Sequence, residues 1–115
     1  GKEDQEAFLN QVLKIETALV PGELLKTILE IEATLGRRRE LKFGPRIIDI
    51  DILFFNDEVI SLSGLKIPHP ELQNRKFVLV PLEEMASGKV HPVLKKNVSQ
   101  LLTECTDPLS VNKFN

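Results

Sequence analysis

The chain has 115 residues, of which 42% are hydrophobic and 28% are charged, and its formal net charge at pH 7 is -2. That length supports one domain around one core, and no apolar run approaches the roughly 20 residues that a membrane-spanning helix needs. The near-neutral charge excludes the strongly basic character of a general nucleic-acid or membrane binder, and the lone Cys105 favours a reducing, cytoplasmic setting.

Apolar and polar residues alternate near the start of the chain. Leu9, Leu13, Ile15 and Leu19 share one parity, whereas several polar residues occupy the other. This period of two predicts a half-buried strand over residues 8–19.

A helix is predicted next, over residues 21–35. Pro21 suits its first turn, and Gly36 is expected to end it. Glu32 is interpreted as a solvated helix position. The apolar residues at helical spacing, which predict core packing, are Leu24, Leu25, Ile28, Ile31 and Leu35.

The segment of residues 37–46, RRRELKFGPR, holds five basic residues against the one acid Glu40. Such a segment is either a solvated charged loop or a local anion site, and charge alone favours the loop. Gly44 and Pro45 define the entry to the next element, which favours a reproducible position for Arg46.

A second strand is predicted over residues 46–55, and it contains the acidic pattern Asp49-Ile50-Asp51. In a strand, side chains at i and i+2 share a face, with Cα atoms roughly 6.5–7 Å apart, so both carboxylates would point the same way. Carboxylates beside arginines are complementary to Mg²⁺ and a polyphosphate. A strand with one wet face is the competing interpretation, because this acidic spacing is common. The residues expected to face the core are Ile48, Ile50, Ile52 and Phe54.

The rest of the chain is divided into short elements. Residues 59–67 are expected to form a loop and then a short extended piece, and residues 77–80 a short apolar run before a helical turn from Pro81. A terminal helix is predicted over residues 98–105, with Asn97 as its cap. This mixture predicts an α+β fold with helices on one face of an antiparallel sheet.

Two stretches, GRRRELKFGPRIIDIDILFF at residues 36–55 and LKIPHPELQNRKFVLVPLEEMA at residues 65–86, resemble the 6-hydroxymethyl-7,8-dihydropterin pyrophosphokinases of folate biosynthesis. The resemblance extends to about Pro92, and the combination of motifs at matching intervals is highly specific. It implies a ferredoxin-like antiparallel sheet and a Mg²⁺-dependent enzyme. That enzyme would transfer pyrophosphate from ATP to the hydroxymethyl group of the pterin, with AMP as the other product.

The same resemblance assigns roles to individual residues. Asp49 and Asp51 would hold two Mg²⁺ ions that bridge ATP and the pterin hydroxyl. Arg37, Arg39 and Arg46 would contact ATP phosphates, the first two from a mobile loop that closes over the nucleotide. The residues implied in catalysis are Arg37, Arg46, Asp49 and Asp51. The residues implied to complete the ATP site are Ile52 near the adenine, and His69 and Arg75 at phosphate. The residues implied at the pterin are Phe8 and Phe77 on its two faces, Asn10 at its edge, Asp49, and Phe43, which stands where tryptophan is common in the family.

The family begins with a strand, a helix and a second strand that have no counterpart in this sequence. We therefore expect residues 1–115 to be the C-terminal majority of a single pyrophosphokinase domain, N-terminally incomplete, with residues 107–115 as a polar tail. The expected partners are ATP and the pterin, together with the missing N-terminal segment or neighbouring folate enzymes. Neither nucleic acid nor a membrane is expected.

Two other functions remain open at this point. A non-enzymatic ferredoxin-like module could bind a nucleotide or RNA through the basic segment, although the negative net charge and the few aromatic residues argue against RNA. A nucleotidyltransferase with the same acidic pattern would release pyrophosphate instead of AMP.

Overall fold

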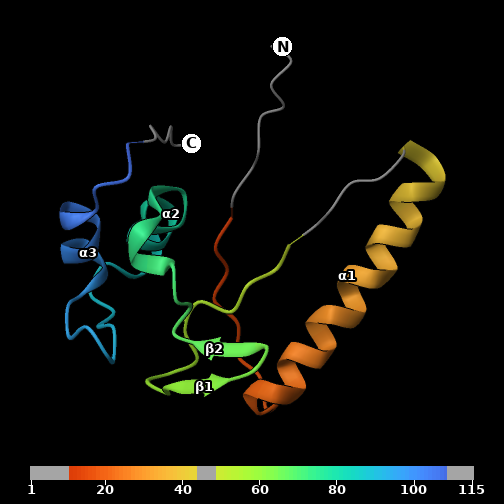
Figure 1. The fold of residues 1–115 in the computed structure, drawn as a ribbon, viewed down its shortest axis with the longest axis horizontal. Coiled ribbons are helices and arrows are strands. Elements are labelled where there is room, and N and C mark those ends of the chain that lie inside the picture. Colours follow the sequence, from red (N-terminus) through yellow and green to blue (C-terminus); the bar gives the residue numbers. More distant parts are fainter. Residues whose placement is uncertain (1–10, 44–48, 109–115) are drawn as a thin grey trace. The chain divides into compact units, whose positions relative to one another are not determined.

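The computed structural model describes residues 11–43 and 49–108, with side chains described for all of these except residues 37–43. These residues form an α+β fold, as predicted: α-helices, one turn of 3-10 helix and a two-stranded antiparallel sheet (Figure 1). They group into two compact units, one of residues 16–70 and one that joins residues 11–15 to residues 71–108. Nowhere in the part of the chain described here is a helix both long and apolar enough to cross a bilayer.

The first unit contains helix α1, Pro21–Phe43. Pro21 opens the helix as predicted, and Glu23 in its first turn suits the positive end of the helix dipole. The predicted stop at Gly36 is wrong, because the helix continues through it and includes much of the expected basic loop. A glycine inside a helix costs only about 1 kcal/mol, and the arginines, Glu40, Leu41 and Lys42 that follow are good helix formers.

The same unit contains a β-hairpin of strands β1, Ile60–Leu62, and β2, Leu65–Ile67. The strands pair antiparallel, with Ile60 opposite Ile67 and Leu62 opposite Leu65. Gly64 in the two-residue turn has a φ of 84°, a conformation that glycine adopts without steric cost. The prediction of a loop followed by an extended piece is therefore corrected to a hairpin, which Gly64 makes possible.

The strands predicted for residues 8–19 and 46–55 are wrong wherever the structure describes them. Neither residues 11–19 nor residues 49–55 form a helix or strand, and Leu13 is 70% exposed. A strand needs a neighbour for its backbone hydrogen bonds, and alternating hydrophobicity does not supply one. Among the residues predicted to face the core, Ile50 is 38% exposed.

The second unit contains a 3-10 turn, Leu72–Asn74, and helices α2, Lys76–Ala86, and α3, Val98–Glu104. Helix α2 absorbs both the expected apolar run and the turn expected from Pro81, although proline removes one helical hydrogen bond. Packing of α2 against α3 offsets that loss. The buried apolar side chains of this unit are Leu72, Leu79, Leu82, Val98 and Leu101.

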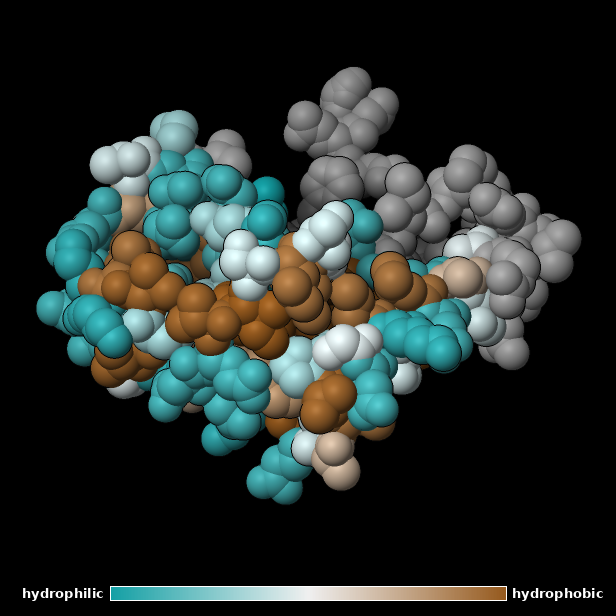
Figure 2. Space-filling model, turned by 60° about the horizontal axis from the view of Figure 1, so that its bottom comes forward, coloured by the Kyte–Doolittle hydropathy of each residue, from teal (hydrophilic) through white to brown (hydrophobic). Residues whose placement is uncertain are grey.

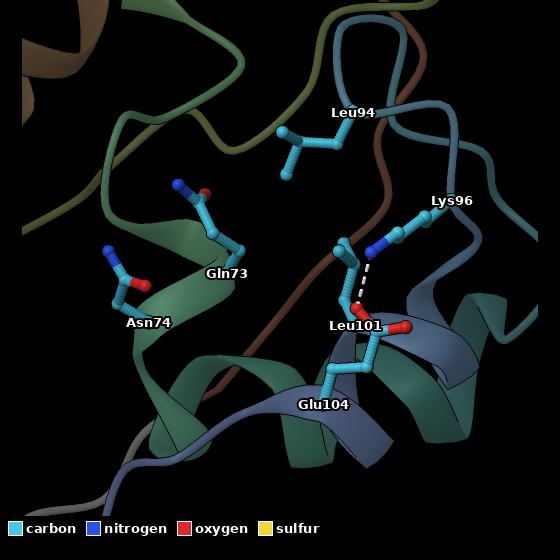
Figure 3. A pocket seen from close by; sticks show the side chains of 6 residues that line it. All are labelled: Gln73, Asn74, Leu94, Lys96, Leu101 and Glu104. Carbon is cyan, nitrogen blue, oxygen red and sulfur yellow. Dashed lines mark hydrogen bonds and ion pairs between the residues drawn. The ribbon is translucent and has the colours of Figure 1, made fainter.

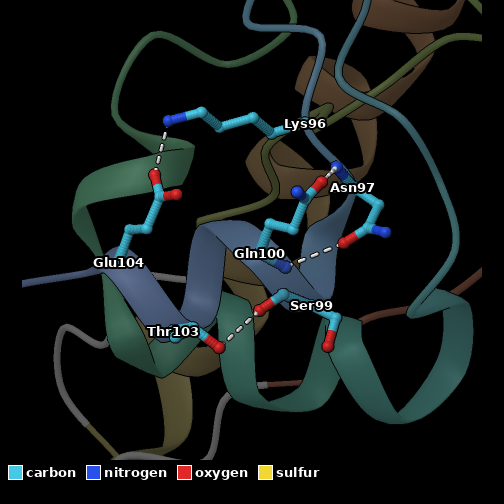
Figure 4. A network of polar contacts seen from close by, with 6 residues as sticks. All are labelled: Lys96, Asn97, Ser99, Gln100, Thr103 and Glu104. Atoms are coloured by element: carbon cyan, nitrogen blue, oxygen red, sulfur yellow. Dashed lines mark hydrogen bonds and ion pairs between the residues drawn. The ribbon is translucent and has the colours of Figure 1, made fainter.

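Asn97 caps α3, as predicted. Its Oδ1 accepts from the backbone N–H of Gln100 at 2.8 Å, and Gln100 Oε1 accepts from the backbone N–H of Asn97 at 2.9 Å (Figure 4). This reciprocal pair is a capping box, which satisfies two backbone donors at the start of the helix. Lys96 Nζ also pairs with Glu104 Oε1 at 2.6 Å, linking the residue before the cap to the end of the helix.

Apolar surface remains open on the molecule, as the brown areas on the face shown in Figure 2 make plain. Within residues 16–70, the buried large apolar side chains among those described are Ile28 and Ile67. This unit therefore covers its apolar residues less completely than the second unit does. Its exposed large apolar residues are Val20, Leu29, Ile31, Ile50, Val59 and Leu62.

Candidate functional site

The acidic pattern of residues 49–51 lies in a segment without regular secondary structure, directly ahead of the hairpin. Asp49 and Asp51 are both exposed, and the side chain of Asp51 keeps 54% of its accessible surface. The carboxylates are therefore open to water and to ligands.

Helix α1 holds this segment through a side chain. Glu32 Oε2 accepts a hydrogen bond of 2.6 Å from the backbone N–H of Ile50, the residue between the two aspartates. A bond from an amide to a carboxylate is charge-assisted and stronger than a neutral one. The peptide bond between Asp49 and Ile50 is planar, so the hydrogen bond from the Ile50 nitrogen to Glu32 also restricts the backbone of Asp49.

The segment after β2 also contacts the acidic segment. The backbone N–H of His69 donates to Leu53 O at 2.9 Å, and His69 Nε2 lies 3.7 Å from Asp51 Oδ2. His69 stands between Pro68 and Pro70, and each proline restricts the residue before it. Two of the residues predicted for the ATP and metal sites, Asp51 and His69, are therefore brought together.

The donor chemistry of this segment fits Mg²⁺. Mg²⁺ takes oxygen ligands, keeps several waters, and uses one or two carboxylates together with substrate phosphates. Within residues 11–36 and 49–108, whose side chains are described, no group of three or more acidic, histidine or cysteine residues gathers around a common point. A dedicated protein cage is therefore lacking in that part, whereas Asp49 and Asp51 offer the exposed carboxylates that a shared site with a phosphate ligand requires.

Arg75 and Phe77 belong to the second unit and are described there by themselves. The guanidinium carbon of Arg75 lies 5.7 Å from the centroid of the Phe77 ring, a cation–π contact. Arg75 is the N-cap residue of α2, and Phe77 lies in its first turn. The start of α2 thus places Arg75, which is predicted to bind phosphate, next to Phe77, which is predicted to contact the pterin.

The structure describes the other predicted site residues only in part. Ile52 is half-buried in the acidic segment. Phe8, Asn10 and Arg46 lie outside the described residues. The backbone of Arg37, Arg39 and Phe43 belongs to α1, and their side chains lie outside the description.

Glu32 is the residue whose contact with the acidic segment the sequence interpretation did not predict. Ile28 is buried and Leu35 is half-buried, so Glu32, four residues after the one and three before the other, lies on the covered side of α1. Ile31, which was expected in the apolar stripe, is instead 45% exposed. The sequence signal that could have indicated this contact is one acid, Glu32, among the apolar residues at helical spacing.

A hollow of about 260 Å³ lies in the second unit (Figure 3). It is smaller than the roughly 300–1,000 Å³ typical of ligand pockets, and its Lys96 and Glu104 side chains pair with each other. None of the predicted site residues lines it, so the acidic segment remains the candidate site. The lining residues are Gln73, Asn74, Leu94, Lys96, Leu101 and Glu104.

Comparison with known proteins gives one consistent family. The family profile described as "7,8-dihydro-6-hydroxymethylpterin-pyrophosphokinase (HPPK)" matches residues 2–87. The chain is 46% identical over 106 residues to the 2-amino-4-hydroxy-6-hydroxymethyldihydropteridine pyrophosphokinase of Aquifex aeolicus (strain VF5), covering 92% of this chain and 66% of that protein. It is 51% identical over 85 residues to the protein of the same name from Bacillus subtilis (strain 168), covering 74% of this chain and 51% of that protein.

A third relative carries a broader name. The chain is 44% identical over 91 residues to the "Folic acid synthesis protein FOL1" of Dictyostelium discoideum, covering 79% of this chain and 14% of that protein. The chain spans between about half and two thirds of the length of the two bacterial relatives. Every residue of the candidate site lies within the matched residues 2–87.

Proposed function

The chain belongs to the 7,8-dihydro-6-hydroxymethylpterin-pyrophosphokinase (HPPK) family, and on that basis we propose that it is part of an enzyme that pyrophosphorylates a pterin alcohol. The hydroxymethyl oxygen of 6-hydroxymethyl-7,8-dihydropterin attacks the β-phosphorus of ATP. The bond from that phosphorus to the oxygen bridging it to the α-phosphate breaks, AMP leaves, and the hydroxyl proton is released to solvent.

The observation that supports this function most directly is the acidic segment itself. Two exposed carboxylates flank an amide that Glu32 holds at 2.6 Å, and His69 lies 3.7 Å from the second carboxylate. Phosphoryl transfer depends on positioning and charge neutralisation more than on a nucleophilic side chain. Two exposed carboxylates on a backbone held by a hydrogen bond suit such a reaction.

Asp49 and Asp51 would hold Mg²⁺, two ions in our proposal. When bound there, Mg²⁺ supplies neutralisation of the charge on the phosphate oxygens. Asp49 and Asp51 orient the bound groups through their restrained backbone, and His69, next to Asp51, would face a phosphate.

The remaining predicted residues complete the proposed site. Arg37, Arg39 and Arg46 bind the phosphates of ATP as planar donors of several hydrogen bonds. Arg75 binds phosphate and Ile52 contacts the adenine. The proposed pterin contacts are Phe8, Asn10, Phe43, Asp49 and Phe77.

Folate synthesis is the proposed setting of the reaction. The Dictyostelium relative is a folic acid synthesis protein of which this chain would span only 14%, so other enzymes of folate synthesis are the proposed neighbours. None of the three relatives named above is described as a non-enzymatic binding module, so none supports that competing hypothesis.

The test is a turnover assay of the full-length enzyme with ATP and the pterin, in which the nucleotide product is identified. We expect AMP, and we expect Asp51→Asn to lower turnover on the order of 10²–10³-fold, as the loss of one electrostatic group in an active site does. The exposed Asp51 side chain predicts an unchanged circular dichroism spectrum for this variant.

The matched control is Glu58→Gln, which removes another exposed acid of the same unit and should keep wild-type turnover. Pyrophosphate as the released product would indicate a nucleotidyltransferase instead. Asp51→Asn turnover within twofold of wild type would contradict the proposed role of the acidic pair.

A further inference from the structure

We infer that Glu32 is a positioning residue, whose carboxylate fixes the backbone between Asp49 and Asp51 and so orients both acids. This role rests on the proposed function, and it adds a residue from α1 to a site otherwise built from the acidic segment. Glu32 does not need to touch the substrate or a metal to act in this way.

The contact joins distant parts of the sequence. Glu32 and Ile50 are 18 residues apart, and their hydrogen bond is 2.6 Å long. Because residues 49–55 belong to no strand, ladder hydrogen bonds do not orient the Ile50 amide there. The Glu32 side chain accepts the hydrogen bond of this amide, which the backbone carbonyl of a neighbouring strand would accept in a sheet.

The position of the contact determines what it controls. The Ile50 nitrogen belongs to the planar peptide that begins at Asp49, so the bond to Glu32 restricts the rotation of that peptide. Beyond Asp51, the carbonyl of Leu53 accepts from the His69 backbone at 2.9 Å. Asp51 therefore lies between two anchor points along the chain, and Asp49 directly precedes the first of them.

The location of Glu32 on α1 affects the hydration of its carboxylate. Glu32 is half-buried, on the side of the helix that also carries the buried Ile28. Its neighbours Glu30 and Ile31 are exposed. An acid at this position gives up part of its hydration, and the charge-assisted bond to Ile50 compensates for that loss.

The experiment uses the full-length enzyme with Glu32→Ala, Glu32→Gln and the control Glu30→Ala, an exposed acid of the same helix. The first measurement is hydrogen exchange of the Ile50 amide without any ligand. We expect exchange at least about tenfold faster in Glu32→Ala and an intermediate rate in Glu32→Gln, which keeps an oxygen acceptor. Glu30→Ala should leave the rate unchanged.

The second measurement separates positioning from substrate contact. Loss of a group that orients metal ligands typically costs 10–100-fold, so we expect Glu32→Ala to lower kcat and the affinity for Mn²⁺ with α,β-methylene-ATP by about that factor. The KM for the pterin should change less than kcat. Glu32→Gln should recover part of both losses.

Each outcome decides the inference. Unchanged Ile50 exchange in Glu32→Ala overturns it, and so does faster exchange with unchanged kcat and Mn²⁺ affinity. If the wild type forms no AMP, the proposed function fails, while the exchange and Mn²⁺ measurements still decide whether Glu32 orients the acidic pair.

Discussion

His91 holds the turn between α2 and α3 through its side chain. Its Nδ1 accepts from the backbone N–H groups of Leu94 at 3.0 Å and Val93 at 3.2 Å, and the residue is only 5% exposed. An imidazole that accepts at Nδ1 must be neutral, because both nitrogens of the protonated ring are donors. Burial lowers the pKa of His91 below its ordinary value of 6.5, which favours the same neutral form.

Stability should therefore depend on pH through His91. In the unfolded chain the ring takes up a proton below its ordinary pKa of 6.5, whereas in the folded protein it does so only at lower pH. The free energy of unfolding should be unaffected by His91 above that pH and fall as the pH drops towards the folded pKa. The slope contributed is at most about 1.4 kcal/mol per pH unit, measurable by urea denaturation between pH 5 and pH 8.

His91→Asn provides the control for this pH dependence. The Asn side-chain oxygen can accept the same backbone bonds without titrating, so this variant should show a flatter profile below pH 6.5. Parallel profiles for the wild type and His91→Asn would show that His91 is not the group responsible.

At the scale of single residues, the sequence indicates which residue types make up the candidate site, but not the contacts that hold them in place. The acidic pair and His69 stand out from the sequence as motifs, and the structure brings Asp51 and His69 to 3.7 Å. The contact of Glu32 with Ile50 spans 18 residues and depends on where α1 lies against the acidic segment. No pattern of residue types along the chain records such a contact.

Among the elements, two glycines have different backbone conformations, one in a turn and one in a helix. Gly64 has a φ of 84° in the hairpin turn, whereas Gly36 lies inside α1. A Cβ added at either glycine would meet no atom within 4 Å, so only the backbone conformation distinguishes the two positions.

Alanine at these positions should change stability in opposite directions. Gly64→Ala should lower the free energy of unfolding by about 1–2 kcal/mol, because a Cβ is strained at this positive φ. Gly36→Ala should raise it by about 0.5–1 kcal/mol, because alanine loses less entropy than glycine in a helix. Thermal or urea denaturation of both variants measures the pair, and destabilisation by Gly36→Ala would mean that α1 does not continue through this residue.

Helices were easier to predict than strands in this chain. The start of α1 at Pro21 and the capping box of Asn97 depend on residues within one helical turn of each other, so local sequence indicates them. The strands expected over residues 8–19 and 46–55 needed partners elsewhere in the chain. A period of two shows which residues could share a face, but it does not show which segment would pair with them.

For the molecule as a whole, burial is concentrated in the second unit. Leu72, Leu79 and Val98 are each fully buried there, whereas helix α1 of the first unit leaves Leu29 54% exposed. Resistance to unfolding should therefore be greater in α2 and α3 than in α1, because local stability follows the buried apolar area.

Leu79→Ala tests this distribution. Removal of a fully buried leucine side chain should lower the free energy of unfolding by about 2–5 kcal/mol and reduce hydrogen-exchange protection in α2 and α3. The matched substitution Leu29→Ala, at an exposed position of α1, should change it by less than about 0.5 kcal/mol. Equal losses from the two variants would contradict the assignment of the core to the second unit.

The sequence by itself determined the family and the helix boundaries that depend on adjacent residues, such as Pro21 and Asn97. These features follow from residue types at short spacing, where the physical interactions are local. Only the tertiary structure decided that residues 49–55 are held by Glu32 and His69 and not by a strand. Hydrogen bonds between distant segments depend on how those segments pack, and packing is a property of the folded chain.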